Sequence, residues 1–243
     1  MNVIFLHGFG EDATVWTDFL KLLPEEHTYF CPDYASETDC GSIEGYTLWL
    51  DTFIEEKQLD KCILIGHSMG GYIALSYADF FKNKVVGLGL FHSSAYADSE
   101  ERKEIRLKTA RVIEQQGTAK FIKGFYPNMF TEEFKEKNAD FIEKQIERYS
   151  YFPKEALMNA QIAMCIREDK TSVLKEANYP IMILAGEKDT FVPKTAALEQ
   201  IALLKNNQSA VLDGVAHAGM FENPNRKCKN SYNIFIQNLR KYL

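Results

Sequence analysis

The stretch Cys62–Phe81, CILIGHSMGGYIALSYADFF, decides the fold of this chain. It opens with a short apolar run, which is typical of a buried strand. The run leads into Gly66-His67-Ser68-Met69-Gly70, and a helical pattern follows. G-x-S-x-G between a strand and a helix indicates a sharp turn that holds the serine in a strained backbone conformation. We therefore predict that the Ser68 hydroxyl stands at the end of a strand and at the amino end of a helix, whose dipole favours negative charge.

Five further apolar runs repeat this order of strand, turn and helix along the chain. Their continuous rather than alternating character favours strands that are buried on both faces by helices. The fold class is therefore α/β, a mostly parallel sheet of about six strands covered by helices. Ligands bind outside the carboxyl ends of such strands, so the loops there should meet at one crevice. The predicted strands are Val3–Leu6, Thr28–Cys31, Cys62–Ile65, Val85–Phe91, Ile181–Ala185 and Ala210–Leu212.

The segment 94–178 interrupts this rhythm with three amphipathic helical patterns. They cover Ala97–Gly117, Thr131–Tyr149 and Phe152–Glu168. We expect the apolar face of the first to carry Ile105, Leu107, Val112 and Ile113. We predict an α/β core formed by residues 1–93 and 179–243, and an inserted all-helical cap, residues 94–178, that forms a lid over the crevice.

Composition limits the class of protein. The chain has 243 residues, of which 46% are hydrophobic and 26% charged, as in ordinary globular domains. These values exclude a disordered, collagen-like or membrane-spanning chain. The formal net charge of −6, without a stripe of Lys and Arg, makes nucleic acid an unexpected partner.

The cysteines and the first residues bear on location. Five cysteines at irregular spacing, with no C-x-x-C pair, indicate reduced thiols and neither a zinc site nor a redox motif. The opening MNVIFLHGFG lacks the basic region of a signal peptide,. We expect a cytoplasmic protein without a membrane anchor.

A serine hydroxyl needs an adjacent base, and the chain offers five histidines. His217, in the small-residue loop DGVAHAGMFENP after the last strand, can be brought over Ser68 and is the predicted base. We expect His67 to point away into packing, His27 to be exposed, His7 to make a structural hydrogen bond and His92 to line the crevice.

The base needs a carboxylate that fixes its tautomer. Asp189 lies just beyond the fifth predicted strand, and the order Ser68…Asp189…His217 is the one expected for this type of sheet,. The alternatives are Glu187 and Asp213, which are less well placed. Asp189 is the predicted acid.

An oxyanion hole needs two fixed N–H donors. One candidate is the backbone N–H of Met69, the residue after Ser68. The second is the backbone N–H of Phe9 in the loop His7-Gly8-Phe9-Gly10 after the first strand, where the glycines let the backbone turn inward,. The Phe9 ring should form part of the pocket wall.

Taken together, these motifs resemble the α/β-hydrolase fold superfamily, in the subgroup with a helical cap and a Ser–Asp–His triad. The resemblance rests on HGFG with Trp16, the Pro32-Asp33 loop, GHSMGG, GEKD and HAGMFENP, in that order. It implies hydrolysis of a small carboxylic ester or thioester through an acyl-enzyme, with no cofactor and no metal. Relatives usually begin with an extra antiparallel strand pair, so we expect a trimmed sheet here.

Two other functions stay open. The same triad serves carbon–carbon bond hydrolases and a lyase of menaquinone synthesis, which often hold carboxylates with cap arginines; the candidates here are Arg102, Arg106, Arg111, Arg148 and Arg167. Other members of the superfamily are small-molecule receptors.

The cap is rich in aromatic residues and methionine, which favours a substrate with an apolar acyl or aromatic part. We expect substrate contacts from Phe9, His92, Phe125, Met129 and Val192, in a monomer or homodimer.

Overall fold

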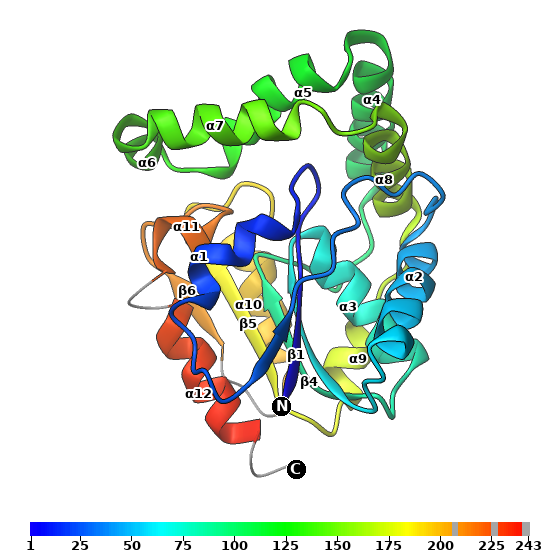
Figure 1. Cartoon of the computed structure of the whole chain (residues 1–243), viewed down its shortest axis with the longest axis vertical. Helices are drawn as coiled ribbons and strands as arrows, with labels where there is room; N and C mark the ends of the chain where they lie inside the picture. The colour runs from blue at the N-terminus through cyan, green and yellow to red at the C-terminus, as the bar shows by residue number, and fades with distance from the viewer. Residues whose placement is uncertain (206–208, 225–227, 240–243) are drawn as a thin grey trace.

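A single six-stranded parallel sheet forms the centre of the computed structural model, which describes residues 1–205, 209–224 and 228–239 (Figure 1). The strand order is β2-β1-β3-β4-β5-β6, and every neighbouring pair is parallel. The strands are β1 (Asn2–Leu6), β2 (Thr28–Phe30), β3 (Cys62–His67), β4 (Val85–Phe91), β5 (Ile181–Gly186) and β6 (Ala210–Leu212). All six predicted strands are confirmed, with ends that differ by no more than two residues.

Helices cover both faces of the sheet because its strands are apolar on both sides. Helices α2 (Ile43–Glu56) and α3 (Met69–Phe80) pack against each other on one face. The opposite face carries η1 (Ala13–Trp16), α1 (Thr17–Leu20) and α12 (Lys229–Leu239) (Figure 1). Two short helices complete the core, α10 (Lys194–Ala202) after β5 and α11 (Gly219–Glu222) after β6.

Aromatic rings join the sheet to this second layer. The Phe5 ring of β1 lies 4.9 Å from the Trp16 ring and 6.0 Å from the Tyr232 ring, centroid to centroid. Phe19 contacts the same rings, and all four side chains are buried. Aromatic burial of this extent dominates the energetics of a core. The cluster therefore anchors the strand whose loop leads into the candidate site.

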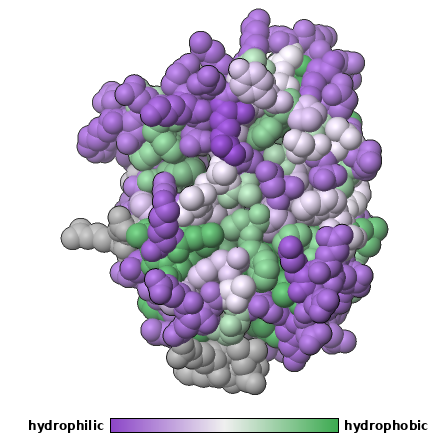
Figure 2. Space-filling model, in the orientation of Figure 1, coloured by the Kyte–Doolittle hydropathy of each residue, from purple (hydrophilic) through white to green (hydrophobic). Residues whose placement is uncertain are grey.

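The helical insertion lies beyond the carboxyl ends of the strands (Figure 1). It consists of α4 (Glu100–Gln116), α5 (Thr118–Phe125), η2 (Tyr126–Met129), α6 (Glu132–Lys137), α7 (Ala139–Tyr149) and α8 (Lys154–Ile166). Helix α9 (Thr171–Glu176) belongs to the predicted cap segment but contacts α3 of the core. Hydrophilic side chains cover most of the outer surface of the insertion in Figure 2, as expected of amphipathic helices that bury one face.

Two details of the insertion differ from the prediction. The single helix predicted over Thr131–Tyr149 is two helices, because the backbone leaves the helical conformation at Asn138 (φ −132°, ψ 33°). Ile105 and Leu107 are exposed, by 63% and 43%. Ile113 is buried as predicted, together with Ala110, so the prediction for this helix was wrong for Ile105 and Leu107.

Hydrogen bonds dock the insertion onto the core at both ends of the site. The backbone N–H of His217 donates to the carbonyl of Met129, 3.0 Å away. The Thr131 backbone N–H and hydroxyl both donate to the Glu222 carboxylate. On the other side, Arg148 donates to Asp12 at 2.5 Å.

Among the described helices, none is long and apolar enough to cross a membrane.

Candidate active site

Ser68 occupies a strained turn between β3 and α3. Its φ of +50° lies in a region that non-glycine residues rarely adopt. The turn is tight because a Cβ on Gly66 would lie 2.3 Å from the Gly70 carbonyl, and a Cβ on Gly70 would lie 2.5 Å from the Leu6 carbonyl oxygen. The Ser68 N–H donates to the Phe91 carbonyl at 2.9 Å. The glycines of G-x-S-x-G therefore let the turn pack between β1 and α3, as the sequence indicates.

The backbone N–H groups of Met69 and Phe9, the two predicted oxyanion donors, have no hydrogen-bond partner among the described residues. Met69 is the first residue of α3, so its N–H has no partner within the helix. Phe9 follows β1 in a turn, and no hydrogen bond from its N–H to another described residue is found. The Phe9 ring lines the same cavity as Ser68.

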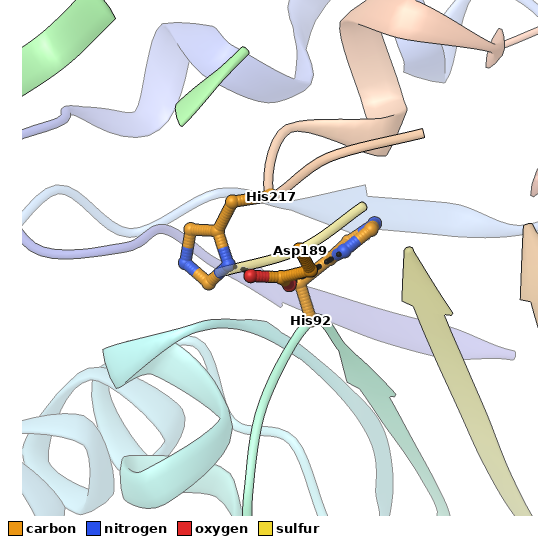
Figure 3. Close-up of side chains that lie close together, drawn as sticks. All are labelled: His92, Asp189 and His217. Carbon is orange, nitrogen blue, oxygen red and sulfur yellow. Dashed lines mark hydrogen bonds and ion pairs between the residues drawn. The ribbon is translucent and has the colours of Figure 1, made fainter. Parts of the chain in front are cut away.

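Asp189 and His217 meet at the carboxyl ends of β5 and β6 (Figure 3). The His217 Nδ1 donates to Asp189 Oδ2 over 2.8 Å. The other carboxylate oxygen accepts the N–H groups of Phe191 and Val192, at 2.8 and 2.9 Å. Burial alone raises a carboxyl pKa, but the charge and hydrogen bond of His217, together with the hydrogen bond of His92, hold the pKa of Asp189 well below its ordinary value,. The alternative acid Glu187 is exposed and accepts from Gly214 and Lys194.

His92 lies behind Asp189 rather than in the crevice, which corrects its predicted role in substrate contact. Its side chain has no exposed surface, it is not among the residues that line the cavity at Ser68, and its Nδ1 lies 3.2 Å from Asp189 Oδ2 (Figure 3). The reason is that the end of β4 (His92 φ +50°) turns the ring toward the neighbouring strand β5. Burial lowers the pKa of His92 to about 4, so the ring is neutral and donates to the carboxylate.

His92, Asp189 and His217 also form the one group of described residues whose donor atoms lie close enough to hold a metal ion, within 4.8 Å of one another. Both Nδ1 atoms already share Asp189 Oδ2 through hydrogen bonds. The carboxylate oxygen that the two rings share is thus already occupied by two hydrogen bonds.

Ser68 and His217 line one cavity, which encloses about 390 Å³ of empty space, part of it open to solvent. No hydrogen bond joins the two side chains among the described residues; such contacts often tighten only when substrate binds. The predicted contacts Phe9, Phe125, Met129 and Val192 line the cavity, and so do Tyr72, Arg102, Arg106, Met164 and Phe191. A larger cavity between α3 and α9 contains none of the predicted site residues.

The sequence did not single out Phe191 and Tyr72. The Phe191 ring lies 4.8 Å from the His217 ring, centroid to centroid, and Tyr72 stands one turn into α3 from Ser68. Their positions relative to Asp189 and Ser68 are the only signal that could have found them, since aromatic residues are common throughout the chain.

Arginines give part of the cavity wall a positive charge. Arg106 donates to Asp98 at 2.9 Å, Arg167 lies 2.8 Å from the same carboxylate, and Arg102 lies 3.6 Å from it. Asp98 is buried, and although burial raises a carboxyl pKa, the arginines hold its pKa below the ordinary value. Three guanidinium groups thus surround one carboxylate, and two of them, Arg102 and Arg106, reach the cavity.

The remaining histidines are structural. His7 donates to the Gly8 carbonyl and accepts from the Tyr34 N–H, as predicted. The side chain of His27 is only 4% exposed, so its predicted exposure was wrong; its ring packs on Tyr29. His67 points away from the cavity, but into an ion pair with Glu11 rather than apolar packing.

A serine on a strained turn and a histidine held by a buried carboxylate, both lining one cavity, are parts that hydrolysis at a carbonyl needs. Together with the six-stranded parallel sheet, they define the class of α/β hydrolases. A model of the alpha/beta hydrolase family matches residues 3–228, and the chain belongs to this family.

Individual relatives are distant. A putative esterase/lipase 2 from Mycoplasma pneumoniae is 24% identical, over 92% of this chain and 84% of that protein. A thermophilic esterase from Thermogutta terrifontis, solved with malate bound, has a TM-score of 0.90 at 24% identity, over 98% of this chain and 90% of that one. MenH from S. aureus has a TM-score of 0.85 at 19% identity, over 99% and 94%. The chain is an alpha/beta hydrolase enzyme.

Proposed function

We propose that this enzyme hydrolyses a small carboxylic ester or thioester through an acyl-enzyme on Ser68. The observation that carries the proposal is the shared cavity, which is lined both by Ser68 on its strained turn and by His217, whose ring is held by Asp189. The helical insertion is the cap that closes this site, and Phe9, Phe125, Met129 and Val192 contact the apolar part of the substrate.

The reaction follows from these roles. Ser68 Oγ attacks the carbonyl carbon while its proton passes to His217 Nε2, and Asp189 stabilises the imidazolium through Nδ1–H. The N–H groups of Met69 and Phe9 bind the tetrahedral oxyanion. Its collapse breaks the bond to the alcohol or thiol, which leaves with the proton from His217. Water, deprotonated by the same histidine, then attacks the acyl-enzyme, releases the carboxylic acid and restores Ser68.

Turnover of p-nitrophenyl esters, from acetate to long acyl chains, tests this proposal. We expect release of p-nitrophenol by the wild type and none above background by Ser68→Ala, with the fold of the variant unchanged. Cys31→Ser is a matched control that leaves the site untouched. More than a few per cent of wild-type activity in Ser68→Ala would disprove the serine mechanism.

A finer proposal concerns charge: the substrate carries a carboxylate beyond the scissile bond. The cluster at Asp98 holds three guanidinium groups for one carboxylate, and an uncompensated cation in a partly buried wall attracts an anion. The similar Thermogutta esterase was solved with malate, a dicarboxylate. We expect kcat/KM for monomethyl glutarate to exceed that for methyl pentanoate by about tenfold, the effect of about 1.4 kcal/mol.

Arg106→Gln should abolish this preference, since Arg106 is largely buried at the wall. Arg148→Gln is the matched control, because Arg148 pairs with Asp12 and does not line the cavity. An unchanged preference in Arg106→Gln would refute the carboxylate subsite.

The same arginines favour the second candidate, cleavage of a carbon–carbon bond or a lyase reaction on a carboxylate substrate with the same triad. Covalent labelling of Ser68 by a fluorophosphonate without turnover of any ester would favour it. Slow ester turnover combined with ligand-dependent binding of a protein partner would instead favour a receptor.

A further inference from the structure

A second histidine–carboxylate pair lies next to the proposed triad. His67 Nδ1 and Glu11 Oε2 are 2.8 Å apart, and neither side chain has any exposed surface. The two residues are 56 positions apart in sequence and belong to different segments, the loop after β1 and the end of β3. Removing a carboxylate and an imidazole from water costs free energy, which the contacts of the pair must offset.

Glu11 holds the loop that carries Phe9. The N–H of Gly8 donates to the same Oε2 atom at 3.0 Å. The loop rests on the pair so closely that a Cβ on Gly8 would lie 2.6 Å from Glu11 Oε2 and 2.8 Å from His67 Nδ1. The position of the Phe9 N–H, one residue further along, is therefore set by the pair.

His67 holds the loop that carries His217. Its second ring nitrogen, Nε2, donates to the backbone carbonyl of His217 at 2.9 Å. A carboxylate and a carbonyl are both acceptors, so both ring nitrogens carry protons and the ring is an imidazolium. Burial alone lowers the pKa of His67, but the charge and hydrogen bond of Glu11 outweigh it and raise the pKa above its ordinary value. The pair is thus ionised.

We infer that Glu11 and His67 are positioning residues for catalysis, which tie the oxyanion loop at Phe9 and the His217 loop to the turn of Ser68. This inference rests on the proposed function. His67 directly precedes Ser68, so the three segments that would supply nucleophile, base and oxyanion donor are joined through one carboxylate and one ring. Neither residue lines the cavity of Ser68, so their influence on the reaction is exerted through the backbone.

The expected effect is on the transition state rather than on substrate binding. Displacement of a catalytic group by about 1 Å can cost about 100-fold in rate, and loss of one oxyanion donor costs a similar factor. Glu11→Ala removes both hydrogen bonds, so we expect kcat to fall about 100-fold with KM within about threefold of wild type. In Glu11→Gln the amide oxygen can still accept from Gly8 and His67, so we expect partial rescue, about tenfold below wild type.

The matched control is Asp51→Asn, which weakens a partly buried carboxylate cluster away from the site. Asp51 accepts from the Tyr77 hydroxyl at 2.8 Å and from Lys84 at 2.7 Å. We expect a lower melting temperature and unchanged kcat. Glu11→Gln with kcat within threefold of wild type would overturn the inference, whether or not Glu11→Ala folds.

A fluorophosphonate probe separates failure of this inference from failure of the proposed function. Ser68 Oγ forms a bond to phosphorus, the P–F bond breaks, fluoride leaves and the hydroxyl proton passes to His217. If the wild type is not labelled at Ser68, the proposed function fails. If it is labelled, and Glu11→Gln is labelled at the same rate, only the positioning role fails.

Nitrogen-15 NMR of the imidazoles provides a readout that loss of stability does not move. In the wild type at pH 7 we expect protons on both ring nitrogens of His67, each coupled to its own nitrogen. A singly protonated ring would contradict the ionised pair from which the inference is drawn.

Discussion

Two histidine–carboxylate pairs lie side by side in this enzyme, with the rings of His67 and His217 only 5.0 Å apart between centroids. Both pairs have the same nitrogen-to-oxygen distance, 2.8 Å. They differ at the second ring nitrogen. In His67 it is bound to a carbonyl, whereas no hydrogen bond within the described residues occupies Nε2 of His217. The two rings therefore differ in what their second nitrogen can do. In His217, the proposed base, it is available to transfer a proton, whereas in His67 it is bound to the backbone and supports it.

The largest effect is expected when the pair of Asp189 and His217 is broken. Asp189→Asn should lower kcat by about 10⁴-fold, because the amide favours the wrong tautomer of His217. Steady-state kinetics with the best p-nitrophenyl ester checks this. Asp213→Asn, an exposed acid four residues before His217, should leave kcat unchanged. If Asp213→Asn had the larger effect, the acid would have to be reassigned.

Breaking the pair of Glu11 and His67 should lower stability in addition to kcat. Glu11→Ala leaves a buried imidazolium without its carboxylate, and such a loss costs about 3–5 kcal/mol of unfolding free energy. Denaturation in urea measures it. The double variant Glu11→Ala/His67→Ala should lose less than the sum of the two single variants. Strict additivity would show that the two side chains do not interact.

The stability that the two pairs contribute should depend on pH in different ways. Burial alone raises the pKa of Glu11, but the charge and hydrogen bond of His67 and the charges of His7 and His217 together outweigh it and lower the folded-state pKa from 4.5. The contribution of Glu11 to stability is therefore present above pH 4.5 and lost as pH falls through the lowered value,. The pKa of His67 is raised from 6.5, so its contribution is complete below pH 6.5 and lost as pH rises through the raised value.

The stability difference between wild type and Glu11→Ala/His67→Ala should therefore be largest between about pH 4.5 and 6.5. The pKa of Asp189 is lowered from 3.8, so the cost of Asp189→Asn should persist at alkaline pH. Urea denaturation from pH 4 to 9 tests both. A difference for the Glu11 pair that keeps growing above pH 8 would contradict the ionised state.

A smaller effect is expected behind the triad. His92→Phe removes one of the two ring donors to Asp189 Oδ2 while His217 keeps its own bond. One hydrogen bond to a charged group contributes about 1.5 kcal/mol, so kcat should fall about tenfold. A loss as large as that of Asp189→Asn would mean that His92, and not His217, is the essential ring.

The smallest effect is expected from a chelator. Since Asp189 Oδ2 already accepts from His92 and His217, the trio needs no metal ion, and incubation with EDTA should change ester turnover by less than about twofold. Loss of activity that zinc restores would place a metal at this trio.

Much of the fold and of the candidate site can be predicted from the sequence because its signals are local. Continuous apolar runs define the six strands, and Gly66 and Gly70 define the turn at Ser68 because a side chain at either glycine would collide with the backbone. The strand ends then bring Asp189 and His217 together, since parallel strands share one carboxyl edge.

The rest depends on contacts between distant segments. Glu11 is one of 34 acidic residues, and only the folded chain shows that it faces His67. The direction of His92 depends on the single backbone angle that ends β4. The exposure of Ile105 and Leu107 on α4 could not be predicted, because arginine side chains on the inner face of this helix take the place of apolar ones at the cavity.

The His217 N–H donates to the Met129 carbonyl, so hydrogen exchange of this amide proton measures how often the insertion leaves the core. While the helices stay docked, the proton is shielded from exchange with deuterium. Each excursion of η2 away from the core exposes it, so its exchange rate gives the free energy of opening directly. The same excursion would withdraw an acceptor from the backbone of the proposed base, so we expect His217 to be fully ordered only while the insertion is docked.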